Sequence, residues 1–330
     1  MLAAVRRADD PHGVVGIEDV ATPQPQSGEV QLRVRACGVC RTDLHIVDAE
    51  LQPHRERVIP GHQIVGEVTA LGAGVDPALA GARLGVSWLG GIDGTCPHCR
   101  AGRENLCDHP TYTGYDRDGG YAEYVCARAD FAVPLPSELD DLRAAPLLCA
   151  GIIGFRALRV AGVAPGERVG LFGFGSSAHL ALQVLRVWNC EVYVATRGEK
   201  HREFARRLGA VWVGDALEKP PVQLDRAVTF APAGDVVIAA LASLRIGGAV
   251  SINAIHLDRM PPFDYDTLLW GERQIRSVTN MTRADARDFL RLAAAERILA
   301  QTTEFALRDA AAALDAVRSD AFDGSSVIRP

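Results

Sequence analysis

The chain has 330 residues, which at about 150 residues per domain predicts two domains. It contains 48% hydrophobic and 23% charged residues, and 35 Lys and Arg against 41 Asp and Glu give a formal net charge of −6. This composition excludes a disordered or fibrous chain and argues against nucleic-acid or membrane partners, and the N-terminus lacks an apolar signal segment, which predicts a cytoplasmic protein.

Short strands separated by turns are predicted over the first 150 residues. Apolar and polar side chains alternate over residues 29–35, a pattern typical of a half-buried strand. Residues 63–72 and 121–126 look similar, and glycines lie beside both. We therefore expect a β-rich first domain.

After residue 150 the pattern changes to strands that alternate with helices. A predicted strand at 167–173 precedes a helix at 176–188, in which Ala178, Leu182 and Leu185 share one face. The series continues with strands at 191–196, 225–230, 249–254 and 274–278, a helix at 198–208, and two Ala-rich helices around a strand at 302–307. Such alternation is typical of βαβ units and predicts a parallel sheet.

The eight cysteines fall into a clustered and a scattered group. Cys96, Cys99 and Cys107 lie within twelve residues on a polar loop rich in Gly and Pro, which in a reducing compartment indicates metal ligation. Eight cysteines could also pair as disulfides, but disulfide scaffolds are small and dense in cysteine. Cys37, Cys126 and Cys190 stand in apolar or strand-like runs, and we expect buried, inert thiols there.

A glycine motif stands between the strand and the helix that follow residue 166. It matches G-x-G-x-x-G/A and reads Gly173, Phe174, Gly175, Ser176, Ser177, Ala178. The first Gly allows a tight turn, the second allows the backbone to approach a pyrophosphate, and the small sixth residue allows close packing of helix on sheet. The motif predicts a dinucleotide site; a purely structural glycine turn is the alternative.

The end of the next predicted strand bears on the choice between NAD and NADP. NAD sites usually have Asp or Glu about 20 residues after the motif, but this chain has Thr196 followed by Arg197. A neutral residue beside a guanidinium favours a 2′-phosphate, and Lys200 and Arg202 add positive charge nearby. We therefore favour NADP over NAD, although an exposed helix start often carries cations without any ligand.

Together with the glycine motif, four segments resemble the zinc-dependent medium-chain alcohol dehydrogenases. They are residues 38–45, residues 60–66, the cysteine loop and residues 147–151, in the family's order and spacing. The resemblance implies an α/β chain with a β-rich GroES-like catalytic domain over residues 1–150, a Rossmann domain with a doubly wound parallel sheet over 151–280, and a return of 281–330 to the catalytic domain. It also implies two Zn²⁺ per chain, NADP or NAD, and a homodimer or homotetramer.

The resemblance assigns Cys40, His62 and Cys149 as ligands of a catalytic zinc. Two thiolates and a neutral imidazole suit Zn²⁺ and leave a fourth position for water or substrate. Asp43 matches a carboxylate that hydrogen-bonds the ligand histidine and so fixes its tautomer and ring orientation. After that histidine the family usually has Glu, whereas this chain has Gln63, which keeps the shape and removes the charge.

Four more residues match positions that serve the substrate, the proton or the cofactor. Thr42 matches the hydroxyl that contacts the substrate oxygen, and His45 matches the next member of a proton relay. Trp88 matches an aromatic residue of the substrate pocket, and Arg41 matches a contact to the cofactor pyrophosphate. The alternatives are a surface imidazole at His45, a surface cation at Arg41 and a merely packed Trp88.

The cysteine loop departs from the family, which has four cysteines there. Asp93 occupies the first position, ahead of Cys96, Cys99 and Cys107. Because a carboxylate can ligate zinc, we expect these four residues to hold a structural zinc. Two alternatives are that His98 replaces Asp93, or that the loop binds metal weakly or not at all.

The activity implied by the resemblance is the interconversion of a small-molecule alcohol with an aldehyde or ketone. Zinc would act as a Lewis acid on the oxygen, and hydride would move to or from the nicotinamide. A zinc-free enone or quinone reductase of the same superfamily is an alternative, against which the three intact ligands count. A non-catalytic NADPH- or zinc-binding sensor is another, in which Thr42 and His45 would have no use as a relay.

Overall fold

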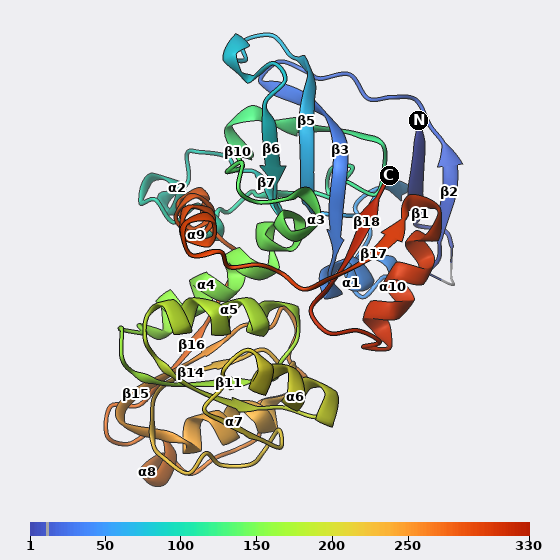
Figure 1. Ribbon diagram of the computed structural model, residues 1–330. Helices are drawn as coiled ribbons and strands as arrows, with labels where there is room; N and C mark the ends of the chain where they lie inside the picture. Colours follow the sequence, from blue (N-terminus) through green and yellow to red (C-terminus); the bar gives the residue numbers. More distant parts are fainter. Residues whose placement is uncertain (11–12) are drawn as a thin grey trace. The chain divides into compact units, whose positions relative to one another are not determined.

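The structure, a computed structural model, describes residues 1–10 and 13–330 and comprises two compact units (Figure 1). Unit 1 contains Met1–Ala150 and Asn280–Pro330, and unit 2 contains Gly151–Thr279. No single helix in these residues is long and apolar enough to cross a membrane; residues 141–148 and 150–161 pass such a test only as a pair, bent by 42°.

A seven-stranded sheet forms the framework of unit 1. Its strands run in the order β10-β6-β5-β3-β18-β17, and β9 pairs with β3. They are β3 (Glu29–Val39), β5 (Gln63–Leu71), β6 (Arg83–Val86), β9 (Tyr124–Arg128), β10 (Ala132–Pro134), β17 (Thr302–Ala306) and β18 (Ser325–Arg329). Smaller sheets join β2-β1-β4 and β7-β8, formed by β1 (Leu2–Arg7), β2 (Val15–Asp19), β4 (Arg57–Val58), β7 (Leu89–Gly91) and β8 (Thr111–Tyr112).

The helices of unit 1 are short, apart from two near the C-terminus. They are α1 (Arg41–Val47), α2 (Pro97–Arg100), α3 (Asp141–Ala144), α9 (Arg283–Glu296) and α10 (Ala310–Arg318). The two Ala-rich helices and the strand between them confirm the prediction for this stretch. β18, which the sequence pattern does not indicate, pairs with both β17 and β3 and so ties the C-terminal segment into the sheet.

The central strand β3 is more buried than the alternation at 29–35 predicts. Of its eleven residues only Arg33 and Arg35 are exposed. β5 pairs along one edge of β3, and β9 and β18 pair along the other. The buried polar residues Glu29 and Gln31 are compensated by partners, since Glu29 pairs with Arg117 and Gln31 donates to the carbonyl of Pro23 at 2.6 Å.

Unit 2 is a parallel six-stranded sheet with helices packed on it. The strand order is β13-β12-β11-β14-β15-β16, which is that of the doubly wound dinucleotide-binding fold. The strands are β11 (Arg168–Phe172), β12 (Glu191–Ala195), β13 (Trp212–Gly214), β14 (Leu224–Thr229), β15 (Leu244–Ile252) and β16 (Gln274–Ser277). The helices are α4 (Ala150–Ala161), α5 (Ser176–Val187), α6 (Glu199–Arg207), α7 (Gly234–Ala242) and α8 (Tyr265–Leu268).

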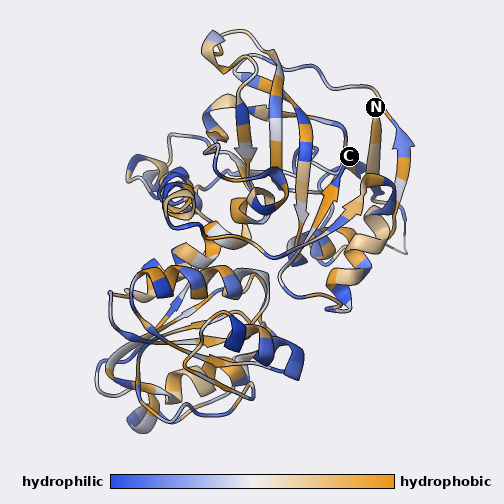
Figure 2. Cartoon of the chain, viewed as in Figure 1, coloured by the Kyte–Doolittle hydropathy of each residue, from blue (hydrophilic) through white to orange (hydrophobic). Residues whose placement is uncertain are grey.

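The predicted fold class, a GroES-like part plus a Rossmann sheet, is confirmed. The predicted strands and helices of unit 2 are all present, whereas the short β13 and the almost uniformly apolar α7 carry no periodic signal. Apolar residues fill the strands of unit 2, whereas α6 is largely hydrophilic (Figure 2). The sequence pattern thus predicts periodic elements and misses those without alternation.

The scattered cysteines differ in burial. Cys37 is fully buried, as predicted, and burial raises the pKa of its thiol well above the ordinary value. The same prediction was wrong for Cys126 and Cys190, which are only half-buried. Cys126 lies on β9, which pairs with β3 alone, and Cys190 lies in the turn before β12. All eight cysteines lie in the described residues, and each is free of disulfide bonds.

Candidate active site

Two thiols and an imidazole from three distant segments meet in unit 1. Cys40 precedes α1, His62 precedes β5, and Cys149 precedes α4. Their ligand atoms all lie within 4.8 Å of one another, and Cys40 Sγ is 3.5 Å from His62 Nε2. We call Cys40, His62 and Cys149 the Cys40 cluster.

Strand pairing explains why two of these residues meet. β3 and β5 are antiparallel, and Gly38 pairs with Gln63 at the end of the ladder. The residues just after β3 and just before β5, Cys40 and His62, therefore lie side by side. Gly61 makes the turn before His62 with φ of +97°, a backbone conformation that favours glycine.

Asp43 hydrogen-bonds the His62 imidazole on the side that faces away from the cluster. The side chain of Asp43 is fully buried, and its Oδ1 lies 3.0 Å from His62 Nδ1. It accepts further hydrogen bonds from the main-chain N–H of Cys40 at 2.9 Å, the N–H of Gly61 at 3.3 Å and the hydroxyl of Tyr121 at 3.0 Å. The structure thus brings Asp43 to His62, as predicted, and directs Nε2 at the cluster. Tyr121 is a partner that the sequence analysis missed.

The electrostatics of the cluster suit a divalent cation. Burial lowers the pKa of His62, but the negative charges of Asp43 and Cys40 outweigh burial and raise it to about 10. A hydrogen bond from the Cys149 thiol, together with His62, lowers the pKa of Cys40, and the same hydrogen bond and burial raise that of Cys149. A cation that binds here must displace these protons, so binding weakens as the pH falls. Two thiolates and an imidazole at this spacing fit zinc.

Helix α1 carries the other predicted catalytic side chains. Thr42 is buried, and its N–H donates to Cys40 Sγ at 3.3 Å. His45 Nδ1 pairs with the carboxylate of Glu50, and the side chains of His45 and Glu50 are 17% and 60% exposed, so both reach solvent. Glu50 was not predicted. Arg41 begins the helix and is exposed.

Two further predicted residues adjoin His62. The ring of Trp88 lies edge-on to the imidazole at 5.0 Å between centroids and stacks on Tyr112 at 4.7 Å. Gln63 is buried over Gly38, and its Oε1 has no hydrogen-bond partner in the part of the chain that the structure describes. Trp88 is therefore placed to shape space near the cluster, and Gln63 presents an uncharged amide where a carboxylate would carry charge.

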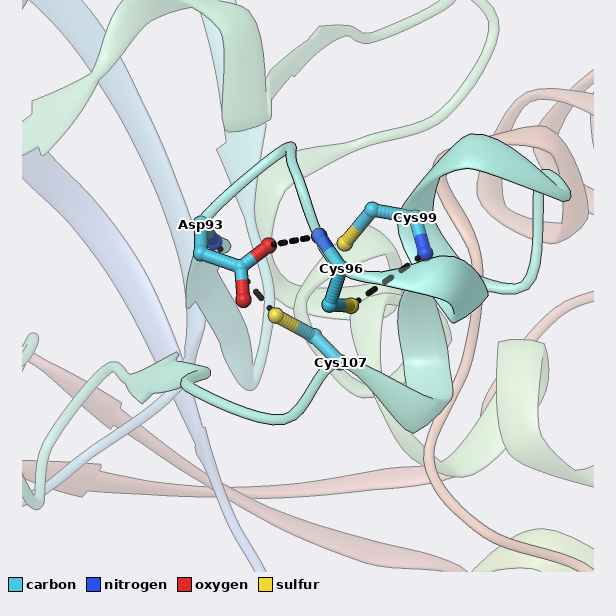
Figure 3. Close-up of side chains that lie close together, drawn as sticks. All are labelled: Asp93, Cys96, Cys99 and Cys107. Atoms are coloured by element: carbon cyan, nitrogen blue, oxygen red, sulfur yellow. Dashed lines mark hydrogen bonds between the residues drawn. The ribbon is translucent and has the colours of Figure 1, made fainter.

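A second group of ligands comes from one loop (Figure 3). The ligand atoms of Asp93, Cys96, Cys99 and Cys107, here called the loop cluster, lie within 4.8 Å of one another. Asp93 Oδ1 accepts the N–H groups of Cys96 at 3.0 Å and Thr95 at 2.8 Å, which lower the pKa of this carboxyl. Burial and neighbouring thiols raise the pKa of Cys99 to about 12. A carboxylate and three sulfurs fit a four-coordinate zinc, and His98 is not part of the group.

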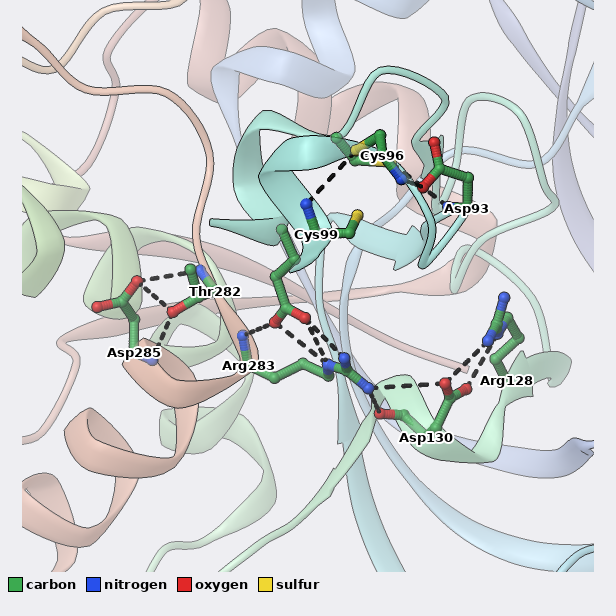
Figure 4. Close-up of polar contacts among 10 residues, drawn as sticks. Asp93, Cys96, Cys99, Arg128, Asp130, Thr282, Arg283 and Asp285 are labelled. Atoms are coloured by element: carbon green, nitrogen blue, oxygen red, sulfur yellow. Dashed lines mark hydrogen bonds and ion pairs between the residues drawn. The ribbon is translucent and has the colours of Figure 1, made fainter. Parts of the chain in front are cut away.

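An ion pair fastens this loop to the C-terminal part of unit 1 (Figure 4). Glu104 accepts the main-chain N–H of Arg283 at 2.6 Å and both Nε and Nη2 of its guanidinium. The guanidinium lies over the ring of Phe131 at 4.5 Å. Thr282 and Asp285 cap the start of α9 at the same point. None of these contacts was predicted.

The glycine motif joins β11 to α5 in unit 2. Gly173 has φ of +90°, and a Cβ there would lie 2.9 Å from the N of Ala231. Among the described residues, a Cβ on Gly175 would meet nothing within 4 Å, and no side chain caps the start of α5. Ala178 is fully buried against the sheet, whereas Ser176 and Ser177 are half-buried. Open space beside the N-terminal turn of a helix fits a pyrophosphate.

Four side chains near the predicted nucleotide site differ in burial and in their partners. Phe174 is buried against Phe204 at 5.7 Å between centroids, so only its main chain is available to a ligand. Thr196 follows β12 and is buried, and Arg197 next to it is exposed. Arg202, expected to add positive charge, is already paired with Glu199 and Asp215.

Comparison with known proteins identifies the family. Residues 26–137 match the alcohol dehydrogenase GroES-like domain. The chain is 48% identical over 319 residues to a probable alcohol dehydrogenase, AdhA, of Mycobacterium tuberculosis, covering 94% of this chain and 92% of that protein. The chain belongs to the zinc-dependent medium-chain alcohol dehydrogenases. It is therefore an oxidoreductase that interconverts alcohols with aldehydes or ketones by hydride transfer, as predicted.

Solved structures of this dehydrogenase family have the same fold. A cobalt- and zinc-bound thermostable alcohol dehydrogenase of Pyrobaculum aerophilum is 26% identical with a TM-score of 0.91, covering 100% of this chain and 99% of that one. An acetophenone reductase of Geotrichum candidum in complex with NAD is 25% identical with a TM-score of 0.88, covering 100% and 97%. Zinc and a nicotinamide cofactor are thus supported for the family fold.

Proposed function

We propose that the chain is a zinc-dependent alcohol dehydrogenase that prefers NADP(H) and whose reaction takes place at the Cys40 cluster. The convergence of Cys40, His62 and Cys149, with Asp43 buried behind the imidazole, carries this proposal. These three residues would hold a zinc ion, whose Lewis acidity would activate a substrate oxygen. Trp88 forms one wall beside His62 and limits the shape of the substrate.

The proton follows residues of α1. The hydroxyl of Thr42 accepts the proton of the substrate hydroxyl in alcohol oxidation and passes it towards the imidazole of His45. Glu50 pairs with His45 Nδ1 and is largely exposed, so the proton leaves to solvent at this point. In the reduction direction the same groups return a proton to the product oxygen.

The cofactor is proposed to bind at the glycine motif of unit 2. Its pyrophosphate would meet the first turn of α5 beside Gly175, where a helix N-terminus favours an anion. The absence of a carboxylate at Thr196 and the exposed Arg197 favour NADP over NAD. Because Arg202 is engaged with two carboxylates, Arg197 and Lys200 are the proposed phosphate contacts.

A double substitution tests this preference. The variant that carries both Thr196→Asp and Arg197→Ile loses a charge-assisted hydrogen bond to the 2′-phosphate of NADPH and gains a charge that repels it. The ratio of kcat/KM for NADPH over NADH should therefore fall roughly 10- to 100-fold. Arg206→Ile is the control, because this guanidinium on α6 is bound to Glu199. An unchanged ratio in the double variant would refute the cofactor assignment.

We further infer one zinc in each cluster, a homodimer or homotetramer, and a cytoplasmic location. The two ligand sets of unit 1 support the zinc count. Elemental analysis should find about two zinc ions per chain, and light scattering on a sizing column measures the oligomer directly. A monomer, or a zinc content of about one per chain or less, would contradict these inferences.

Turnover tests the function itself. With aliphatic and aromatic aldehydes as substrates, the enzyme should oxidise NADPH faster than NADH. Cys149→Ala should abolish oxidation of both cofactors. Cys126→Ala, which changes a half-buried thiol on β9, is the matched control and should retain activity. Reduction of an enone that survives Cys149→Ala would instead favour the zinc-free reductase.

A further inference from the structure

Tyr121 lies beside the Cys40 cluster and makes two contacts with the segment that carries His62 and one with Asp43. Its side chain is fully buried, and its main-chain N–H donates to the carbonyl of Pro60 at 3.0 Å. Its ring packs so closely on Gly61 that a Cβ there would lie 2.4 Å from the ring. Its hydroxyl donates to Asp43 Oδ2 at 3.0 Å. One residue thus contacts both the turn before the ligand and the carboxylate that orients it.

Asp43 has four hydrogen-bond donors, two on each oxygen. Oδ1 faces His62 Nδ1 at 3.0 Å and the N–H of Gly61 at 3.3 Å. Oδ2 accepts the N–H of Cys40 at 2.9 Å and the hydroxyl of Tyr121 at 3.0 Å. The rotation of a carboxylate about its last bond is soft, so the donors on Oδ2 fix the plane in which Oδ1 meets the imidazole.

We propose that Tyr121 is a positioning residue of the Cys40 cluster, whose hydroxyl orients His62 through Asp43 and slows the loss of the metal. This inference rests on the proposed function only in taking the cluster as a metal site. Removal of the hydroxyl leaves buried Oδ2 with a single donor, and the carboxylate can then turn away from His62. A ligand imidazole whose partner is less well fixed holds its metal less firmly.

Tyr121→Phe isolates the hydroxyl because it keeps the ring against Gly61. Tyr124→Phe is the matched control: the same atom is removed three residues later, where the hydroxyl accepts from Arg33 Nε at 3.2 Å at the surface. Zinc-loaded enzyme is mixed with the chelator 4-(2-pyridylazo)resorcinol, and the release phase that Cys149→Ser lacks belongs to the Cys40 cluster. Tyr121→Phe should accelerate that phase about three- to tenfold and leave the loop-cluster phase unchanged.

Cobalt substitution supplies a readout that a loosened fold would not move. The d–d bands of Co²⁺ bound at the Cys40 cluster should shift in Tyr121→Phe, shift further in Asp43→Asn, and match wild type in Tyr124→Phe. Unchanged release and spectra in Tyr121→Phe would overturn the inference, and so would equal acceleration of both release phases. A wild-type enzyme without any Cys149-dependent phase would instead refute the metal site on which the proposed function rests.

Discussion

The two metal-ligand clusters of unit 1 are built in opposite ways. The loop cluster comes from residues 93–107, and its ligand atoms accept neighbouring main-chain N–H groups, such as Cys99 N–H to Cys96 Sγ. The Cys40 cluster joins residues 40, 62 and 149 and depends on the pairing of β3 with β5. One cluster is organised by its own loop, whereas the other exists only when the sheet has formed.

The polar contacts that surround the two clusters differ as well. Behind the Cys40 cluster a buried carboxylate, Asp43, is saturated by four donors and orients one ligand. At the loop cluster the Glu104–Arg283 ion pair instead fastens the loop to the first residue of α9. Under the proposed function, the first arrangement would orient a ligand of the reactive metal, and the second would anchor the loop that holds a structural one.

The largest effect that separates the clusters is expected at Asp93. Asp93→Ala removes the carboxylate ligand, so we expect zinc content to fall from about two ions per chain to about one while turnover per remaining zinc persists. Elemental analysis alongside kinetics measures both. Asp93→Cys restores the family's ligand and should restore the zinc. Retention of all zinc in Asp93→Ala would show that Asp93 is not a ligand.

A smaller effect is expected where the loop is anchored. Glu104→Gln replaces hydrogen bonds between charged groups and should lower the free energy of unfolding by about 2 kcal/mol, measured by denaturant titration. Burial raises the pKa of Glu104, but Arg283 outweighs burial and lowers it overall from 4.5. The pair therefore stabilises the fold above about pH 4.5, and this contribution is lost as the pH falls through the lowered pKa.

The variant should accordingly lose less stability on acidification than wild type. Glu67→Gln, in an exposed pair with Arg35, is the control and should change stability by roughly 0–1 kcal/mol. Equal losses in the two variants would show that the Glu104 pair contributes no more than a surface ion pair.

The smallest effect is expected at Gln63, beside the reactive site. Without a carboxylate there, the metal at the Cys40 cluster should be more electrophilic. The pH–rate profile of wild type should therefore lie about one pH unit or less below that of Gln63→Glu. Profiles of kcat/KM against pH measure the displacement. Superimposed profiles would show that the charge at this position has no bearing on the reaction.

The sequence predicts the loop cluster and the glycine motif well because their residues are close together in the chain. Spacing alone brings Cys96, Cys99 and Cys107 into one loop, and the strand-to-helix context identifies Gly173 and Gly175. The Cys40 cluster was accessible only through resemblance to a family, since nothing in local spacing relates residue 62 to residue 149.

Several of the missed residues act across long separations or lie in elements without a periodic signal. Tyr121 reaches Asp43 across 78 residues, and Arg283 reaches Glu104 across 179. β18 carries two buried serines, Ser325 and Ser326, which obscure its strand pattern. Such contacts are set by how strands pair and which neighbours cover them, and a single sequence does not specify these in advance.

The division of the two clusters into a reactive and a structural site is tested most directly by measuring zinc content and turnover on the same samples. Wild type, Cys149→Ser and Cys99→Ser are compared after their secondary structure has been checked. We predict about two zinc ions in wild type, one zinc and no turnover in Cys149→Ser, and one zinc with turnover retained in Cys99→Ser. Turnover that survives in Cys149→Ser but is lost in folded Cys99→Ser would contradict the assignment.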